Sequence, residues 1–338
     1  MKRFSALLLA ALMLLLTFAG CAETREQPEE PLPADPFLTE EAELSEPTEP
    51  ELPEPAGPEP VPVPDDKPES EPVPAPAEPV QPEKTDRPGH KSTRTDDRKF
   101  WTIRAEIQQN AADFKKQNPD TVGWLYLWDT TVDSPVFQRE SDNDYYLKHN
   151  DVGAKDRNGA LVSDYRNRLT GRGSQSQNLV IYGHSKDENP NGGVEASREY
   201  EHFTELKRWQ NIDFCRAHPY FLFATPEESE VFEVFAVFHT KTDFIYNRPD
   251  PSYDEMSAIL TEAKEKSLFD FNVEVSPSDR IMTLSTCCRR IVPTYPNGWR
   301  FVVMGRLVEA GKPLNYERTV TENPTAVTPQ NPKGGAAV

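Results

Sequence analysis

Cys287 is the residue of this chain best suited to covalent chemistry. The chain holds four cysteines, and Cys21 follows an N-terminal apolar run that marks export. The other three, Cys215, Cys287 and Cys288, are an odd number, so at least one thiol should stay outside internal disulfides. No Cys-x-x-Cys spacing offers a zinc site. A thiol at the end of a predicted strand is then a candidate nucleophile, and a buried, inert cysteine is the alternative.

Two further apolar runs each carry a residue that could assist a thiol. The run NLVIYGH reads as a strand that ends in His184, and the run RFVVMGRL begins at Arg300. The run TLSTC ends at Cys287. In the order histidine, cysteine, arginine, these pieces resemble a sortase, most closely one of class B, over about residues 100–308. The resemblance implies that Cys287 is the nucleophile, His184 the catalytic histidine and Arg300 the catalytic arginine.

The residue types suit these roles. A thiol has a pKa of about 8.5, so at neutral pH it needs cationic neighbours to hold a useful thiolate population. Attack on a Thr carbonyl would place negative charge on its oxygen, which Arg300 can stabilise because a guanidinium does not deprotonate. His184 can protonate the leaving amine and later accept the proton of an incoming amine. Cys287 would hold an acyl-enzyme thioester between these two steps.

Three other arginines compete for the role of Arg300. Arg289 and Arg290 are closer to Cys287 in the sequence, but the resemblance places them in a loop that the family varies freely. Arg306 shares a strand face with Arg300. Six residues at about 3.3 Å each separate the two by about 20 Å, so only one of them can reach the thiol.

Ser285 alternates onto the same strand face as Cys287. The resemblance implies that Ser285 contacts substrate, and the alternative is a strand hydroxyl satisfied by the backbone. No metal site is expected, since the Asp-x-Asp-x-Asp-Gly pattern of a calcium loop is absent, and no cofactor is expected either. Four further histidines are interpreted as surface or packing residues: His149, His202, His218 and His239.

The periodicity of the chain predicts a mainly β domain. Residues 97–118 read as an amphipathic helix, because apolar side chains recur at three- and four-residue spacing. Further helices are predicted near residues 203–209 and 253–266. Short strands with few helices favour a closed barrel, and the resemblance implies eight strands, an N-terminal helix and a helix inserted before the cysteine strand. The predicted strands are residues 122–128, 134–138, 179–182, 220–224, 231–239, 281–286 and 300–308.

Proline and negative charge are concentrated in one segment. Residues 22–90 hold 19 of the 33 prolines and 20 Asp/Glu against 4 Lys/Arg, which gives −16 of the net charge of −19. Few large apolar residues and mutual repulsion predict a disordered linker over residues 22–96. Two compatible interpretations stay open: a passive linker, and a spacer that holds the domain within the wall layer. Residues 91–338 carry a net charge of only about −5, which gives no support for a nucleic-acid partner, since such a partner requires a basic face.

The N-terminus predicts export and a membrane tether. Residues 1–21 combine a short basic head, an apolar run and Cys21, which is the shape of a secretory signal. The run FAGC at residues 18–21 resembles a bacterial lipobox, so Cys21 is either lipidated or part of an uncleaved signal anchor. The catalytic domain is predicted over residues 97–314, and residues 315–338 are predicted to be a disordered tail.

The resemblance implies a transpeptidase held on the outer face of a Gram-positive cell membrane. Its expected partners are surface proteins with a C-terminal sorting signal, cleaved after Thr, and an amine of peptidoglycan or lipid II. Three alternatives stay open: an extracellular cysteine peptidase with water as acceptor, a pilin-polymerising sortase, and a sortase-shaped binding protein without turnover.

Overall fold

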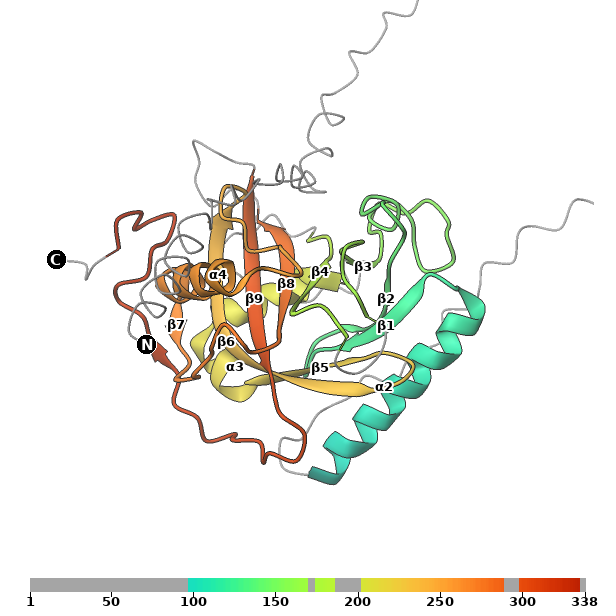
Figure 1. Ribbon diagram of the computed structural model, residues 1–338, viewed down its shortest axis with the longest axis horizontal. Helices are drawn as coiled ribbons and strands as arrows, with labels where there is room; N and C mark the ends of the chain where they lie inside the picture. Colours follow the sequence, from blue (N-terminus) through green and yellow to red (C-terminus); the bar gives the residue numbers. More distant parts are fainter. Residues whose placement is uncertain (1–96, 170–173, 186–201, 289–297, 335–338) are drawn as a thin grey trace, which may run out of the picture. The chain divides into compact units, whose positions relative to one another are not determined.

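Eight strands close into a barrel in the computed structural model (Figure 1). The model describes residues 97–169, 174–185, 202–288 and 298–334, all within the second of two units, Pro36–Val338. The barrel order is β1-β2-β3-β4-β8-β9-β6-β5, which confirms the predicted closed eight-stranded barrel. Its strands are β1 (Thr121–Tyr126), β2 (Asp133–Phe137), β3 (Leu161–Ser163), β4 (Asn178–Tyr182), β5 (Tyr220–Ala224), β6 (Ser229–Lys241), β8 (Ile281–Cys288) and β9 (Trp299–Leu307).

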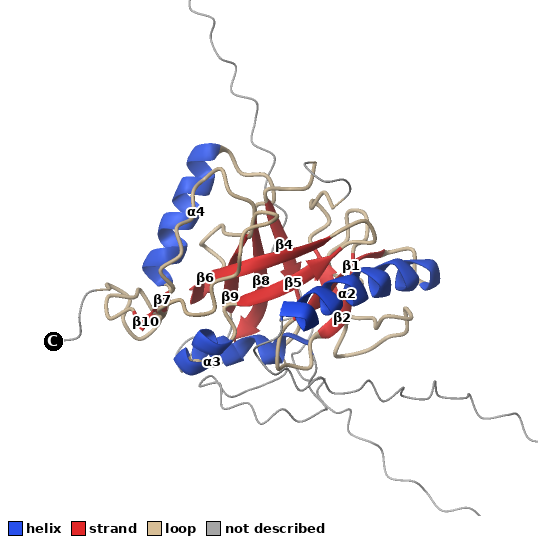
Figure 2. Ribbon diagram, turned by 90° about the horizontal axis from the view of Figure 1, so that it is seen from below, coloured by secondary structure: helices blue, strands red, loops and turns tan. Residues whose placement is uncertain are grey.

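Helices pack against several strands of the barrel. In the described part of the chain they are α2 (Asp97–Gln117), the 3-10 helix η1 (His202–Gln210), α3 (Ile212–Ala217) and α4 (Tyr253–Lys266). α2 lies along β1 and β5 (Figure 2), where Ile107 and Ala111 are buried against Trp124 and Leu222. α4 packs against β6 and precedes β8 in the chain. The predicted N-terminal helix and the predicted helix before the cysteine strand are therefore confirmed.

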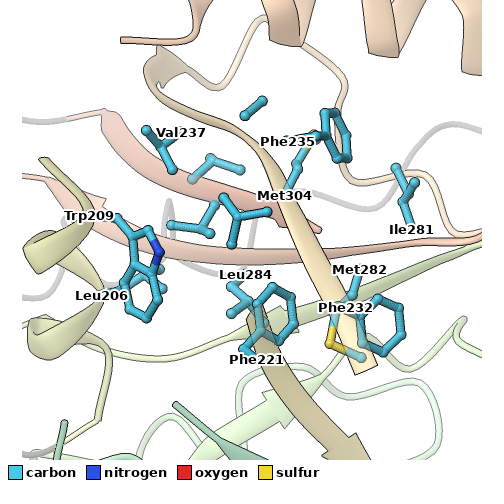
Figure 3. Close-up of a cluster of buried hydrophobic side chains, with 14 of the residues drawn as sticks. Leu206, Trp209, Phe221, Phe232, Phe235, Val237, Ile281, Met282, Leu284 and Met304 are labelled. Carbon is cyan, nitrogen blue, oxygen red and sulfur yellow. The ribbon is translucent and has the colours of Figure 1, made fainter. Parts of the chain in front are cut away.

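The main core joins η1 to the strands that carry the candidate residues. Figure 3 shows Leu206 and Trp209 of η1 in one cluster with Leu284 of β8 and Val237 of β6. Each large apolar side chain that leaves water contributes about 1.5–3 kcal/mol to stability. Because η1 shares this core with β8 and β9, it supports the ladder between those two strands.

The C-terminal segment is ordered, which corrects the prediction of a disordered tail from residue 315 onward. β10 (Thr321–Glu322) pairs with β7 (Phe269–Asp270). Val320 and Ala326 are buried, and the backbone N–H of Val327 donates to the carbonyl of Glu265 on α4 at 2.9 Å. The polar, proline-bearing composition carries no periodicity that reveals such docking. The folded body therefore extends past residue 314, at least to residue 334.

The predicted signal segment, Cys21 and the acidic linker all lie outside the described residues. Within the residues that the structure does describe, no helix has both the length and the apolar character needed to cross a bilayer.

Candidate active site

Two of the three candidate catalytic residues, Cys287 and Arg300, pair on neighbouring strands, and the third, His184, lies just beyond the end of the strand on the other side. β4 and β8 run parallel with Tyr182 opposite Ser285, and the N–H of Gly183 donates to the carbonyl of Ser285 at 3.3 Å. The same register continued by two residues brings His184 level with Cys287. On the other side β8 and β9 are antiparallel, and Cys287 pairs with Arg300. Adjacent strands lie about 4.8 Å apart, so the three residues form one row.

His184 is held by a backbone carbonyl. Its Nε2 lies 2.8 Å from the carbonyl oxygen of Leu147, and the side chain is 5% exposed. A carbonyl can only accept, so Nε2 carries the proton in this hydrogen bond. Nδ1 is then the nitrogen that can take up or release a proton in a reaction. The contact fixes the ring orientation and the tautomer, which a general acid and base requires.

The backbone just before His184 is fixed by close packing. A Cβ on Gly183 would lie 2.7 Å from Cδ2 of Leu161 and 2.9 Å from Cγ of Phe203, so only glycine lets η1 approach this closely. The hydroxyl of Thr286, the residue before Cys287, donates to the carbonyl of Gly183 at 2.7 Å. These contacts tie the end of β4 to β8 and set His184 beside Cys287.

Cys287 differs from the other two thiols of the described chain in exposure. It is partly exposed and packs against the cluster that contains Tyr146 and Leu147. Cys288 is buried in the main core, which places it on the opposite face of β8. Burial raises the pKa of the Cys215 thiol far above its usual value, and its Sγ donates to the carbonyl of Trp209 at 3.1 Å. Cys287 is therefore the thiol with the environment of a nucleophile.

Arg300 and Arg306 lie on one face of β9 in different surroundings. Arg300 is 1% exposed, is the register partner of Cys287, and donates from Nη1 to the carbonyl of Trp299 at 3.1 Å. Arg306 pairs with Ile281 at the other end of β8. The structure thus places Arg300, and not Arg306, next to the thiol. Two other predicted competitors, Arg289 and Arg290, lie outside the described residues.

Ser285 lies one step below Cys287 on the same strand face and is completely buried. Its Oγ is 2.7 Å from the hydroxyl of Tyr246. The structure therefore gives Ser285 a tyrosine hydroxyl as its partner, and its contact with substrate stays a prediction. No sequence signal pointed to Tyr246, because it lies in the irregular segment between β6 and α4, 39 residues before Ser285.

Three further histidines of the described chain, His149, His218 and His239, lie in packing environments. The ring of His149 stacks on Tyr145 with a centroid distance of 4.0 Å, and Nε2 of His218 lies 2.8 Å from a carboxylate oxygen of Asp129. Burial, with a smaller contribution from Lys207, lowers the pKa of His239 to about 3. Within the described residues, no group of three His, Cys, Asp or Glu side chains is placed to hold a metal ion.

Comparisons with known proteins bear on this row. No protein-family model matches the chain. The sortase B of Listeria monocytogenes is 35% identical over 219 residues, which are 64% of this chain and 82% of that protein. The solved substrate complex of Staphylococcus aureus sortase B aligns with a TM-score of 0.51 at 26% identity, over 64% of this chain and 99% of that one. A sortase B structure complexed with triglycine aligns with a TM-score of 0.50 at 26% identity, over 64% and 100%.

Proposed function

The chain belongs to the sortase B family, and from this premise we propose that it cleaves a sorting signal after Thr and joins the Thr carbonyl to a cell-wall amine. The observation that carries the proposal is the row of His184, Cys287 and Arg300 across β4, β8 and β9. Among the solved relatives, one is a substrate complex and one is complexed with triglycine. A free amino group is the kind of acceptor that the proposal requires.

The first step is acylation of Cys287. The thiolate attacks the Thr carbonyl carbon, a C–S bond forms, and the negative charge that develops on the oxygen is stabilised by the guanidinium of Arg300. The Thr amide bond then breaks, and the leaving amine takes a proton from His184. The thioester retains the acyl group of the surface protein, and the C-terminal remainder of the signal departs.

The second step is transfer to an amine of peptidoglycan or lipid II. The incoming amine attacks the thioester carbonyl, the C–S bond breaks and an amide forms, while His184 accepts the proton that the amine loses. Arg300 again stabilises the tetrahedral oxyanion. Cys287 returns to its starting state, so the cycle is balanced without an oxidant or a cofactor.

The test is incubation with a library of sorting-signal peptides, read by mass spectrometry. We expect an adduct on Cys287 whose mass equals the acyl part of a peptide that ends in Thr. The Cys287→Ala variant should form no adduct and no product. Turnover that persists in this variant would exclude Cys287 as the nucleophile.

The acceptor is tested by the same assay with and without an added amine. Glycine peptides or fragments of peptidoglycan should convert the adduct into an amide product faster than water hydrolyses it. A rate and product that do not depend on the amine would identify a peptidase. Amide formation only with the lysine side chain of a pilin subunit would identify a pilin polymerase instead.

We further propose that the enzyme acts outside the cell, tethered through residues 1–21. The basic head, the apolar run and the small residues before Cys21 support a lipid-modified anchor, with an uncleaved signal segment as the other form of tether. Metabolic labelling with a fatty-acid probe should mark the wild type and not Cys21→Ser. An unlabelled but membrane-bound wild type would favour the uncleaved segment.

A further inference from the structure

One dipeptide contacts both strands that carry the reactive thiol and the imidazole. Tyr246 places its hydroxyl 2.7 Å from Oγ of Ser285 on β8, and Asn247 donates from Nδ2 to the hydroxyl of Tyr182 at 3.1 Å. Tyr182 and Ser285 are register partners, and each precedes its reactive residue by two positions. The Tyr246-Asn247 dipeptide therefore bridges β4 and β8 at a level two residues before His184 and Cys287.

A closed ring of hydrogen bonds fixes the Asn247 side of this dipeptide. The Tyr182 hydroxyl donates to Oδ2 of Asp164 at 2.9 Å. Arg166 binds both carboxylate oxygens of Asp164 at 2.8 Å and donates from Nη2 to the carbonyl of Asn247 at 3.0 Å. Asp164 and Tyr182 are almost completely buried. Because the Tyr182 hydroxyl has one proton and gives it to Asp164, it must accept from Asn247, so the direction of the chain of bonds is determined.

A second link anchors the same segment to both strands. Asn178, at the start of β4, donates from Nδ2 to the carbonyls of Tyr246 and Arg248 at 2.9 and 3.1 Å. Its Oδ1 accepts the hydroxyl proton of Thr283 on β8 at 2.7 Å. Two independent sets of bonds thus hold this segment across β4 and β8. In a buried network in which every donor and acceptor role is fixed, we expect the removal of one polar group to displace the groups that it contacts.

We propose that Asp164, Tyr182 and Asn247 are positioning residues, which hold the ends of β4 and β8 in register so that His184 stays level with Cys287. In this proposal they act through the two strands. The turnover test rests on the proposed function, whereas the thiol reactivity of the resting protein does not depend on it.

The decisive comparison is Tyr182→Phe against Tyr220→Phe. Tyr220 lies on β5 and donates its hydroxyl to the buried carboxylate of Glu233 at 3.1 Å, on the part of β6 that pairs with Arg306. Each variant removes one hydroxyl bonded to a buried carboxylate and keeps the ring. We expect the two variants to lose similar amounts of thermal stability, so the melting temperature serves as the matched control.

Two readouts separate positioning from stability. The first is the rate at which iodoacetamide alkylates Cys287, followed at the peptide level by mass spectrometry from about pH 5 to pH 9. The second is kcat and KM with a sorting-signal peptide and an amine. For Tyr182→Phe we expect a shifted pH profile of alkylation and a kcat about tenfold lower, with KM nearly unchanged. For Tyr220→Phe we expect the wild-type profile and the wild-type kcat.

Asn247→Leu provides a second test. Asn247 is partly exposed, so the fold should tolerate this substitution more easily than a substitution of the buried Tyr182. The variant should shift the alkylation profile in the same direction as Tyr182→Phe. The inference would be overturned if Tyr182→Phe and Asn247→Leu both gave the alkylation profile of the wild type. Equal shifts of the profile in Tyr182→Phe and Tyr220→Phe would overturn it as well. If the wild type processes no sorting peptide, the proposed function fails, while the alkylation profiles still decide this inference.

Discussion

The two ends of the ladder between β8 and β9 use the same residue type for different purposes. Arg300 and Arg306 lie on one face of β9, six positions apart, and pair with Cys287 and Ile281 respectively. Arg306 forms an ion pair of 3.0 Å with buried Glu233. Arg300 lies beside a partly exposed thiol near the end of β8. The two arginines therefore differ in their partners, a buried carboxylate for Arg306 and a candidate nucleophile for Arg300, although they share a residue type and a strand face.

The far end of the ladder is built around one carboxylate. Glu233 is paired with Arg306 and also with Arg318 of the C-terminal segment, and it accepts the hydroxyl of Tyr220. A buried carboxylate is tolerated when ion pairs and hydrogen bonds replace its hydration. These contacts join β5, β6 and β9 to the C-terminal segment, so this end of the ladder stabilises the fold.

The largest expected difference between the two ends is in the rate of turnover. Arg300→Ala should lower kcat/KM about 10³-fold, because the oxyanion loses its cationic neighbour. Arg306→Ala should keep kcat/KM within about threefold and instead lower the free energy of unfolding by about 1–3 kcal/mol, because buried Glu233 loses one of its two arginine partners. The measurement is steady-state kinetics on samples whose folded fraction is known from denaturant titration. Comparable losses of turnover in both variants would remove the distinction between the two ends.

The sequence predicted most of the barrel and the order of the three candidate residues. Apolar runs located seven of the eight strands, since each run is long enough to show β periodicity. β3 was missed because it has only three residues and owes its place to pairing with β2 and β4. The C-terminal segment was assigned to a disordered tail because its burial depends on partners such as Glu233 and Glu265, which lie far away in the sequence.

The supports of the candidate site were less predictable than the residues themselves. His184 and Cys287 end recognisable strands, so motif and order were sufficient to single them out. Tyr246 and Asp164 belong to irregular segments, and their contacts with β8 and β4 follow only from the closed barrel. The same holds for the carbonyl of Leu147 that orients His184, since no side chain marks a backbone acceptor in a sequence.

A second way to compare the ends is to overpack each with a single methyl group. In Gly183→Ala the new Cβ would meet Cγ of Phe203 at 2.9 Å, and in Gly305→Ala it would meet Cε1 of Phe221 at 2.6 Å. Both variants should lose about 1–3 kcal/mol of stability. Only Gly183→Ala should also lower kcat, by about 100-fold, because it displaces His184.

The matched pair of glycine variants has a simple readout. Thermal denaturation gives the stability loss, and the rate of thioester formation on Cys287 gives the effect on chemistry. A normal thioester rate in Gly183→Ala would show that His184 tolerates movement of its backbone. A slow rate in Gly305→Ala would show that strain at the far end reaches the thiol.

Removal of residues 315–338 tests whether the end of the ladder that carries Arg306 can be destabilised without slowing thioester formation on Cys287. The deletion takes away Arg318, the pairing of β10 with β7, and the burial of Val320 and Ala326. We expect the free energy of unfolding to fall by about 3 kcal/mol. The rate of thioester formation per folded molecule should stay within about twofold of the full chain. Arg318→Ala should reproduce a part of the stability loss, and a large fall in the rate would place the C-terminal segment among the supports of the site.

The smallest expected effect is a pH dependence of stability that arises at the end of the ladder that carries Arg300. His239 lies on β6 opposite Phe301, next to the position of Arg300, and its pKa is lowered from 6.5 to about 3 by burial and by Lys207. The folded protein therefore keeps His239 neutral, while the unfolded chain binds a proton below about pH 6.5. Stability is present above this pH and is lost as the pH falls toward 3. At pH 5 the loss amounts to about 2 kcal/mol.

Urea titrations of the wild type and His239→Gln at about pH 7 and pH 5 measure this effect. The free energy of unfolding should depend less on pH in the variant than in the wild type. An identical pH dependence would mean that His239 titrates normally in the fold.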